Sequence, residues 1–285
     1  MILISIALGL LSMVAYALAN VYSKPLSQRL GAPQTLFLRG ITIAVLLAIP
    51  SMANASKLGD AKVVLATIAL GIVGYLPVLA FTHAIRESRI GIVAPIAGTS
   101  PLVTVLLSFI FLGVLLSGGQ WVALVVIVLA NIVVSIDFKN LRNSDVISKA
   151  SGIPYALIAA LGWGVFFFAL VYAARALSAW QAAWLCEVGV TIAAGAHLFI
   201  TKQKILFKEA SNKLVMFNGA LISVGTVAYT IGAKNYNVGI VAALSNSTAL
   251  LALILGFLLY KERFSRREVA ALLTMVVGVV ILTVL

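Results

Sequence analysis

Long apolar runs alternate with short polar gaps along the whole chain, and this pattern predicts ten membrane-spanning helices. A helix needs about 20 apolar residues to cross the hydrocarbon core of a bilayer. Runs of about this length recur between the charged residues. We place the helices at residues 2–22, 34–52, 63–83, 90–112, 120–136, 153–173, 180–199, 214–233, 238–260 and 268–285. The first run lacks a basic leading segment, so we expect a retained helix rather than a cleaved signal peptide.

The composition excludes the other broad classes of protein. Of the 285 residues, 62% are hydrophobic and 10% are charged, and the mean hydropathy is +1.14. Soluble domains are about 45–50% apolar and about 25% charged, and disordered chains are poor in apolar residues. The net charge of +12 does not indicate a nucleic-acid partner, because the basic residues occupy the gaps between apolar runs. We therefore predict an all-α integral membrane protein.

An internal repeat divides the chain into two halves. Residues 138–152 form the longest polar connection, and they separate a first repeat at residues 1–137 from a second repeat at residues 153–285. A shift of 148 residues places Gly91–Ala94 on the identical Gly239–Ala242. Because each half holds five helices, an odd number, the second half enters the membrane from the opposite side. Such inverted repeats underlie alternating access in many transporters.

The positive charges indicate the orientation, since cytoplasmic connections retain Lys and Arg. The connections that follow the even-numbered helices carry four basic residues, Lys57, Lys62, Arg175 and Lys234. Those that follow the odd-numbered helices carry fifteen, namely Lys24, Arg29, Arg86, Arg89, Lys139, Arg142, Lys149, Lys202, Lys204, Lys208, Lys213, Lys261, Arg263, Arg266 and Arg267. We therefore predict a multi-pass protein of the cell (inner or plasma) membrane with the connection 138–152 in the cytoplasm and both termini outside.

Four sequence features together resemble the EamA-like permeases of the drug/metabolite transporter superfamily. They are Arg39 in Phe-Leu-Arg-Gly, the Thr-Ser-Pro at 99–101, the stretch Gly-Phe-Leu-Leu-Tyr-Lys-Glu-Arg-Phe at 256–264, and Gly278 in the last helix. The resemblance implies ten helices, a central cavity lined by helices 1, 3, 4, 6, 8 and 9, and peripheral helices 5 and 10. Members carry amino acids, sugars, nucleotide sugars or drugs, so the resemblance does not name a cargo.

Polar residues inside the predicted spans are candidates for lining the cavity, because polar groups that face lipid are costly. In the first helix Ser12, Tyr16 and Asn20 are spaced by four and share one face. In the fourth, Pro95 and Pro101 flank Gly-Thr-Ser and predict an interruption. The shift of 148 places Ser245 to Thr248 of the ninth helix opposite this segment. Paired interruptions of this kind indicate a transport site, although interhelical hydrogen bonds or a simple kink would also explain them.

Two charges lie inside predicted spans, Arg39 and Glu187, and the shift of 148 aligns them. With a rise of about 1.5 Å per residue in a core about 30 Å thick, they differ by about 12 Å in depth. We therefore expect no direct contact, with each charge serving its own half. Arg39 is a candidate anchor or snorkelling residue. Burial disfavours a charged carboxylate, so Glu187 is a candidate proton carrier, and His83 is an interfacial residue or a relay.

Aromatic residues of the spans complete the candidate site, since they can form apolar walls or simply pack between helices. We predict that substrate is bound by Tyr16, Asn20, Tyr75, Thr99, Ser100, Trp163, Phe167, Tyr229, Ser245, Asn246 and Thr248. We predict that coupling or gating depends on Arg39, Glu187 and His83.

These features predict a secondary transporter of small polar or amphipathic metabolites, with amino acids the best single candidate and a multidrug or cation exporter the alternative. No Gly-x-x-x-x-Gly-Lys-Ser/Thr loop is present, which argues against direct use of ATP. An enzyme would need converging titratable groups, and a channel would need repeated polar rings. We expect no cofactor or metal. The expected partners are a small-molecule substrate, the lipid bilayer and protons as a possible coupling ion, in a monomer or weak homodimer.

Overall fold

The computed structural model describes residues 2–53, 60–88, 90–113, 117–135, 152–248, 251, 254–255, 258 and 265–284. In this part of the chain all regular structure is helical. Its elements are α1 (Ile2–Leu30), α2 (Ala32–Ala53), α3 (Ala61–Glu87), α4 (Ile90–Ala97), α5 (Ser100–Leu112), α6 (Gly118–Ser135), α7 (Ile153–Ala176), α8 (Ala179–Ile200), the 3-10 helix η3 (Phe207–Ser211), α9 (Lys213–Asn235), α10 (Val238–Asn246) and α12 (Arg266–Val284). The predicted connection at 138–152 (Gly152 excepted) and most of the stretch 256–264 lie outside the described residues.

These elements confirm the predicted all-α membrane fold. Six of the described helices, α1, α2, α3, α7, α8 and α9, are long and apolar enough to cross a membrane. The predicted fourth helix is divided into α4 and α5 by a turn at Gly98 and Thr99, with Pro101 in the first turn of α5. In the second repeat α10 ends at Asn246, and a turn follows at Ser247. Both interruptions therefore fall where the repeat predicted them.

Polar side chains at the helix starts explain several boundaries. Ser178 and Gln181 form a reciprocal capping box at α8, with bonds of 3.1 Å in both directions, which satisfies N–H groups that have no partner within the helix. At α10 the cap is one-sided, since Oδ1 of Asn237 accepts from the backbone N–H groups of Gly239 and Ile240. One predicted boundary is wrong, because α1 continues beyond residue 22 through Pro25. It ends before Gly31, whose φ of +84° favours glycine.

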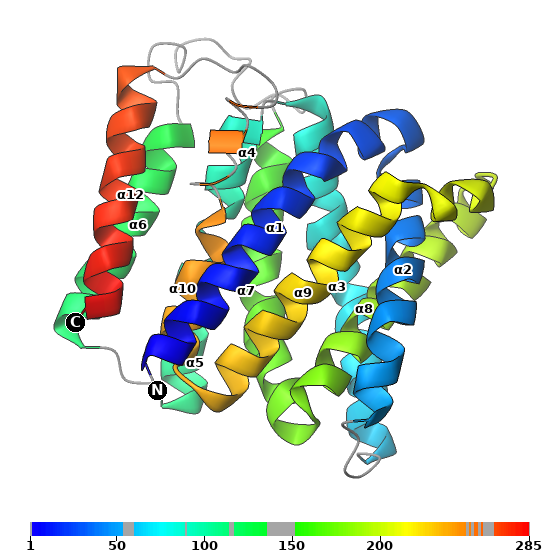
Figure 1. Cartoon of the computed structure of the whole chain (residues 1–285), viewed down its shortest axis with the longest axis horizontal. Coiled ribbons are helices and arrows are strands. Elements are labelled where there is room, and N and C mark those ends of the chain that lie inside the picture. The colour runs from blue at the N-terminus through cyan, green and yellow to red at the C-terminus, as the bar shows by residue number, and fades with distance from the viewer. Residues whose placement is uncertain are drawn as a thin grey trace.

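The helix packing follows the two-repeat symmetry. With the shift of 148, α3 corresponds to α9, α2 to α8, and α1 to α7. Accordingly α1 packs on α9 as α7 packs on α3, and α3 packs on α8 as α9 packs on α2. Figure 1 shows α6 and α12 side by side at one edge of the bundle, with both termini at the same end. The peripheral placement implied for helices 5 and 10 is therefore observed.

Close backbone contact fixes α8 against α3. A Cβ on Gly71 would meet the carbonyl oxygen of Cys186 and would stand 2.9 Å from the Cα of Gly189. A Cβ on Gly189 would likewise meet the carbonyl oxygen of Ile68. Small residues at helix crossings let membrane helices approach this closely. The contact holds the middle of α8, and therefore Glu187, at a fixed place in the bundle.

Candidate functional site

A cavity lies where the two repeats meet, and both repeats line it. The cavity has a volume of about 70 Å³, which is room for several waters or a small solute. The first repeat contributes side chains from α1, α2 and α3, and the second from α7, α8, α9 and the end of α10. The lining residues are Tyr16, Asn20, Ser23, Arg39, Val78, Phe81, Thr82, Ile85, Trp163, Phe166, Phe167, Glu187, Val190, Ile222, Thr226, Ser245 and Thr248.

Glu187 reaches the cavity at the end of a short chain of hydrogen bonds. The Thr226 hydroxyl donates to Oε1 of Glu187 at 3.1 Å, and the Tyr16 hydroxyl donates to Oγ1 of Thr226 at 3.1 Å. The Tyr16 ring fits against α9 because Gly225 has no side chain, where a Cβ would stand 2.7 Å from the ring. This chain joins α1, α9 and α8, and it orients one oxygen of the carboxylate.

Arg39 of α2 is held by hydrogen bonds to α1 and α9. Its Nη1 donates to Oγ of Ser23 at 3.4 Å and to Oδ1 of Asn218 at 3.5 Å. Asn218 in turn donates to the backbone oxygen of Ala19 at 2.7 Å and to Ser23 at 3.0 Å. Arg39 is only 7% exposed. The guanidinium therefore lies inside the bundle and does not extend to the membrane surface, as snorkelling would require. Its role in coupling or gating remains a prediction.

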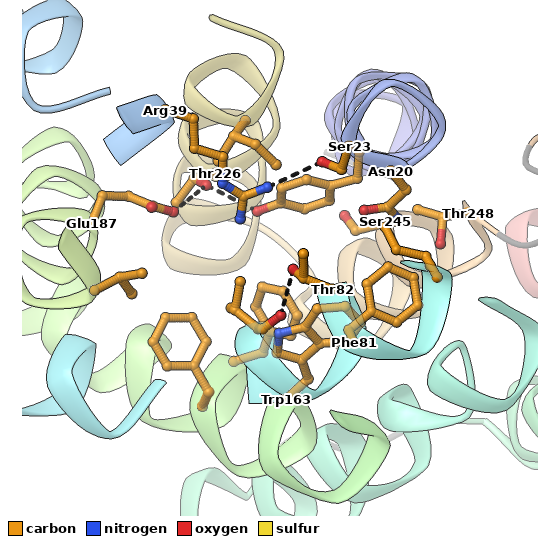
Figure 2. A pocket seen from close by; sticks show the side chains of 17 residues that line it. Asn20, Ser23, Arg39, Phe81, Thr82, Trp163, Glu187, Thr226, Ser245 and Thr248 are labelled. Atoms are coloured by element: carbon orange, nitrogen blue, oxygen red, sulfur yellow. Dashed lines mark hydrogen bonds between the residues drawn. The ribbon is translucent and has the colours of Figure 1, made fainter. Parts of the chain in front are cut away.

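Arg39 and Glu187 line one cavity without forming an ion pair. Within the described residues, no oxygen of Glu187 comes within 4.0 Å of a nitrogen of Arg39. The expected lack of direct contact is thus observed, but the expectation that each charge serves its own half is wrong. The depth estimate treated the two helices separately, whereas α2 packs directly on α8. Figure 2 shows both charges and Thr226 along the same wall.

Aromatic rings form the opposite wall of the cavity. The rings of Phe81 and Trp163 lie 4.8 Å apart between centroids, and those of Phe166 and Phe167 lie 5.6 Å apart. Figure 2 shows Phe81 and Trp163 across the cavity from Arg39 and Glu187. The cavity therefore offers charge on one side and apolar surface on the other.

Eight predicted residues meet at this cavity. Two of them, Ser245 and Thr248, are buried in the interrupted part of the second repeat, and the hydroxyl of Ser245 has no hydrogen-bond partner among the described residues. Figure 2 shows Ser245 and Thr248 beside Asn20, at one end of the charged wall. The eight are Tyr16, Asn20, Arg39, Trp163, Phe167, Glu187, Ser245 and Thr248.

Two other predicted residues lie outside the cavity lining. The hydroxyl of Tyr75 lies 3.0 Å from Nδ1 of His197, and this pair joins α3 to α8. The ring of His83 stacks on Tyr155 at 5.9 Å between centroids. Each side chain is occupied in a contact between helices, so a role in binding or gating for Tyr75 or His83 remains a prediction.

Three more predicted residues are also absent from the cavity lining. Thr99 donates to the backbone oxygen of Ile96 at 2.8 Å in the turn between α4 and α5, and Ser100 is fully buried at the start of α5. The buried Tyr229 donates to the backbone oxygen of Phe167 at 3.3 Å, with the rings 4.7 Å apart. The side chain of Asn246 lies outside the described residues.

Sequence analysis missed the residues that orient the two charges. Ser23 continues the spacing of Tyr16 and Asn20 along one helix face, but the predicted helix ended one residue earlier. Thr226 and Asn218 carried no signal of their own, because single Thr and Asn residues are common between membrane helices. The resemblance also implied lining by helix 4, whereas in the described part of the chain α2 and α8 take that place.

The sequence matches the pattern of the EamA-like transporter family twice, at residues 3–136 and 150–284. A protein of Archaeoglobus fulgidus described as an uncharacterized transporter is 23% identical over 212 residues, which cover 73% of this chain and 71% of that protein. A protein of known crystal structure matches 97% of this chain and 95% of its own with a TM-score of 0.71 and 16% identity. At that identity the likeness shows a shared fold.

Proposed function

The chain belongs to the EamA-like transporter family, and we propose that it moves small polar or amphipathic metabolites across the membrane by alternating access through the central cavity. The family makes it a multi-pass membrane transporter rather than an enzyme. One observation supports the mechanism above all others: the cavity lies between two repeats of opposite orientation, and the interruption of the second repeat contributes Ser245 and Thr248 to its lining. Sites of this kind are exposed to one side and then to the other when the repeats rock.

The position of the cavity supports an inward-facing conformation. The lining reaches Ile85, two residues before the end of α3, and on α1 it begins at Tyr16. This half of the bundle adjoins the end that carries Arg86, Lys202 and Arg266. Toward the opposite end Gly9 of α1 packs on Leu244. Placing the basic end in the cytoplasm puts both termini outside.

Amino acids are the best substrate candidates. An amino acid combines a small, strongly polar head with a side chain of variable polarity, and the cavity combines a charged wall with an aromatic one. Small-molecule sites commonly pair an apolar lining with a few placed polar groups that fix orientation.

The second candidate function is the export of organic cations. The presence of Glu187 in one cavity with Phe81, Trp163 and Phe166 supports it, since carboxylates and aromatic faces both attract cations. Arg39 opposes it, because the guanidinium is in the same cavity and repels a second positive charge. We therefore rank this function below amino-acid transport.

Glu187 is the proposed site of proton coupling. It is the acidic residue among the described lining of the cavity, and the ionisable groups that interact with it electrostatically are Arg39, Tyr16 and Cys186. A carboxylate shielded from water can exchange a proton as its surroundings change. A proton gradient would then drive substrate movement without ATP.

Counterflow in proteoliposomes tests the transport function. Vesicles loaded with an unlabelled amino acid should take up the same labelled amino acid faster than empty vesicles, because a carrier returns to the outside sooner when loaded. Vesicles without protein are the control. Uptake that rises linearly with concentration and ignores the internal substrate would indicate a channel. The absence of uptake for amino acids, sugars, nucleotides and organic cations alike would overturn the proposal.

A further inference from the structure

We infer that the cavity selects zwitterions by two-point recognition, with Arg39 binding a carboxylate, Glu187 binding an ammonium group, and the aromatic wall holding an apolar side chain. This assignment rests on the proposed transport function and deepens it. It makes α-amino acids with large apolar side chains the preferred substrates. Analogues that carry only the ammonium group or only the carboxylate group should therefore be poor ligands.

The hydrogen bonds of Arg39 leave most of its donors free for a ligand. A guanidinium has five N–H donors in a planar fork. In the described part of the chain only Nη1 donates, over 3.4 Å to Ser23 and 3.5 Å to Asn218, and both acceptors are neutral. A buried cation without an anion is unfavourable. A ligand carboxylate would supply the missing charge and fit the fork through two parallel hydrogen bonds.

Only one of the two carboxylate oxygens of Glu187 has a hydrogen-bond partner among the described residues. Its Oε1 accepts from Thr226 at 3.1 Å, and Oε2 accepts from none of the described residues. Its hydrogen-bond partner is a neutral hydroxyl, and no Lys or Arg of the described chain pairs with it. An ammonium group has three donors, so it can bind Oε2 and still reach a neighbouring oxygen. Ser245, whose buried hydroxyl lacks a partner, is a polar atom of the same cavity.

The separation of the two charges favours a zwitterion over a simple ion. Because they form no ion pair with each other, both remain available to a ligand placed between them. A cation alone would leave Arg39 unpaired, and an anion alone would leave Glu187 unpaired. A zwitterion pairs both and adds no net charge to a region shielded from water.

The aromatic wall determines which zwitterions fit. Phe81 and Trp163 face the charged wall (Figure 2), and Val78 and Ile85 extend the apolar surface. A head group held at Arg39 and Glu187 would direct its side chain toward these rings. An aromatic or branched apolar side chain would bury its surface there, whereas a charged side chain would lose its hydration without a partner.

A series of three ligands on the purified protein in nanodiscs tests this inference by calorimetry. L-Phenylalanine carries both head groups, 2-phenylethylamine only the amine, and 3-phenylpropanoate only the carboxylate. Losing a charge-assisted hydrogen bond to a buried partner costs about 10- to 150-fold in affinity. We expect both analogues to bind weaker than L-phenylalanine by about that factor. Equal binding of either analogue, or no binding of L-phenylalanine, would overturn the inference.

Variants assign each head group to its residue. In Arg39→Gln, L-phenylalanine should bind no better than 2-phenylethylamine, and in Glu187→Gln no better than 3-phenylpropanoate. Thr230→Val is the control that should preserve all the preferences, because Thr230 is buried outside the cavity and bonds only within α9. The wild-type series decides the question even where a variant does not fold. Counterflow of another solute class without zwitterion selectivity would overturn this inference and leave the proposed transport function standing.

Discussion

Arg39 and Glu187 occupy equivalent positions of the two repeats, 148 residues apart, and line one cavity from α2 and α8. In an inverted repeat, equivalent positions approach the centre of the bundle from opposite sides. The fold is therefore close to symmetric here while the charges are opposite. This breaks the symmetry of the site and gives it a positive and a negative end.

Asn218→Ala should destabilise the folded protein. Asn218 is fully buried and donates to Ala19 and Ser23 while it accepts from Arg39. Removing it leaves these partners unsatisfied, and we expect the free energy of unfolding to fall by about 1–3 kcal/mol. Thermal denaturation in detergent measures the change, with Asn235→Ala at the exposed end of the same helix as the control. An unchanged Tm would show that water replaces the amide.

Thr226→Val should weaken substrate binding. The variant keeps the shape of the side chain but removes both the donor to Glu187 and the acceptor for Tyr16. We expect affinity for L-phenylalanine to fall by about 5- to 150-fold. Thr230→Val removes a hydroxyl one turn further along the helix, with bonds only to its own backbone, and should leave calorimetric binding as it was. Equal losses in the two variants would indicate general damage to α9.

Much of the fold could be predicted because a membrane-spanning helix is recognisable from its own stretch of sequence. Length, apolar runs and basic gaps gave the ten-helix pattern, and Pro101 with Gly98 marked an interruption that the structure contains. The end of α1 was mispredicted because a charged residue, Lys24, followed by Pro25 is typical of the end of a membrane-spanning helix. The helix continues past both and ends only before Gly31.

The site was predictable only in part, because it depends on contacts between distant segments. The spacing of polar residues in α1 identified Tyr16 and Asn20. Glu187 was identified because acidic residues are rare inside membrane-spanning segments. The meeting of Glu187 with Arg39 depends on the packing of α2 against α8, which no local pattern encodes. Tyr75 was a candidate because aromatic residues of the spans can form cavity walls or pack between helices, and in the structure its hydroxyl is paired with His197.

Gly71→Ala should prevent normal folding of the bundle. The added Cβ would meet the backbone of Cys186 and Gly189, and α3 and α8 would have to separate. Overpacking of this kind costs about 1–3 kcal/mol or more. Size-exclusion chromatography should show less monodisperse protein. Gly118→Ala is the matched control, since a Cβ there meets nothing within 4 Å. Normal yield and elution of Gly71→Ala would show that the two helices can shift at little cost.

Cysteine labelling should place the basic end in the cytoplasm. In a Cys186→Ala background, Lys62→Cys and Lys208→Cys introduce exposed thiols in connections assigned to opposite sides. An impermeant maleimide added to intact cells should label position 62 and should label position 208 only after the membrane is opened. The reverse pattern would place both termini in the cytoplasm and make the present conformation outward-facing.

Glu187→Gln should separate exchange from accumulation. Glutamine keeps the shape and can still accept from Thr226, but it cannot carry a proton. If Glu187 couples transport to the proton gradient, the variant should exchange labelled for unlabelled amino acid and fail to concentrate it under an imposed pH gradient. Because the variant should also bind the substrate ammonium group more weakly, the assay uses a saturating substrate concentration for each protein.

The comparison rests on the ratio of the two rates within each protein. Wild-type vesicles should accumulate substrate when the pH gradient is imposed and lose the accumulation when an ionophore dissipates it, while exchange continues. In Glu187→Gln the rate of exchange should not respond to the gradient or to the ionophore. Accumulation by the variant to the wild-type level would mean that the proton, if one is used, is carried elsewhere. Glu187 would then act only as the partner of the substrate ammonium.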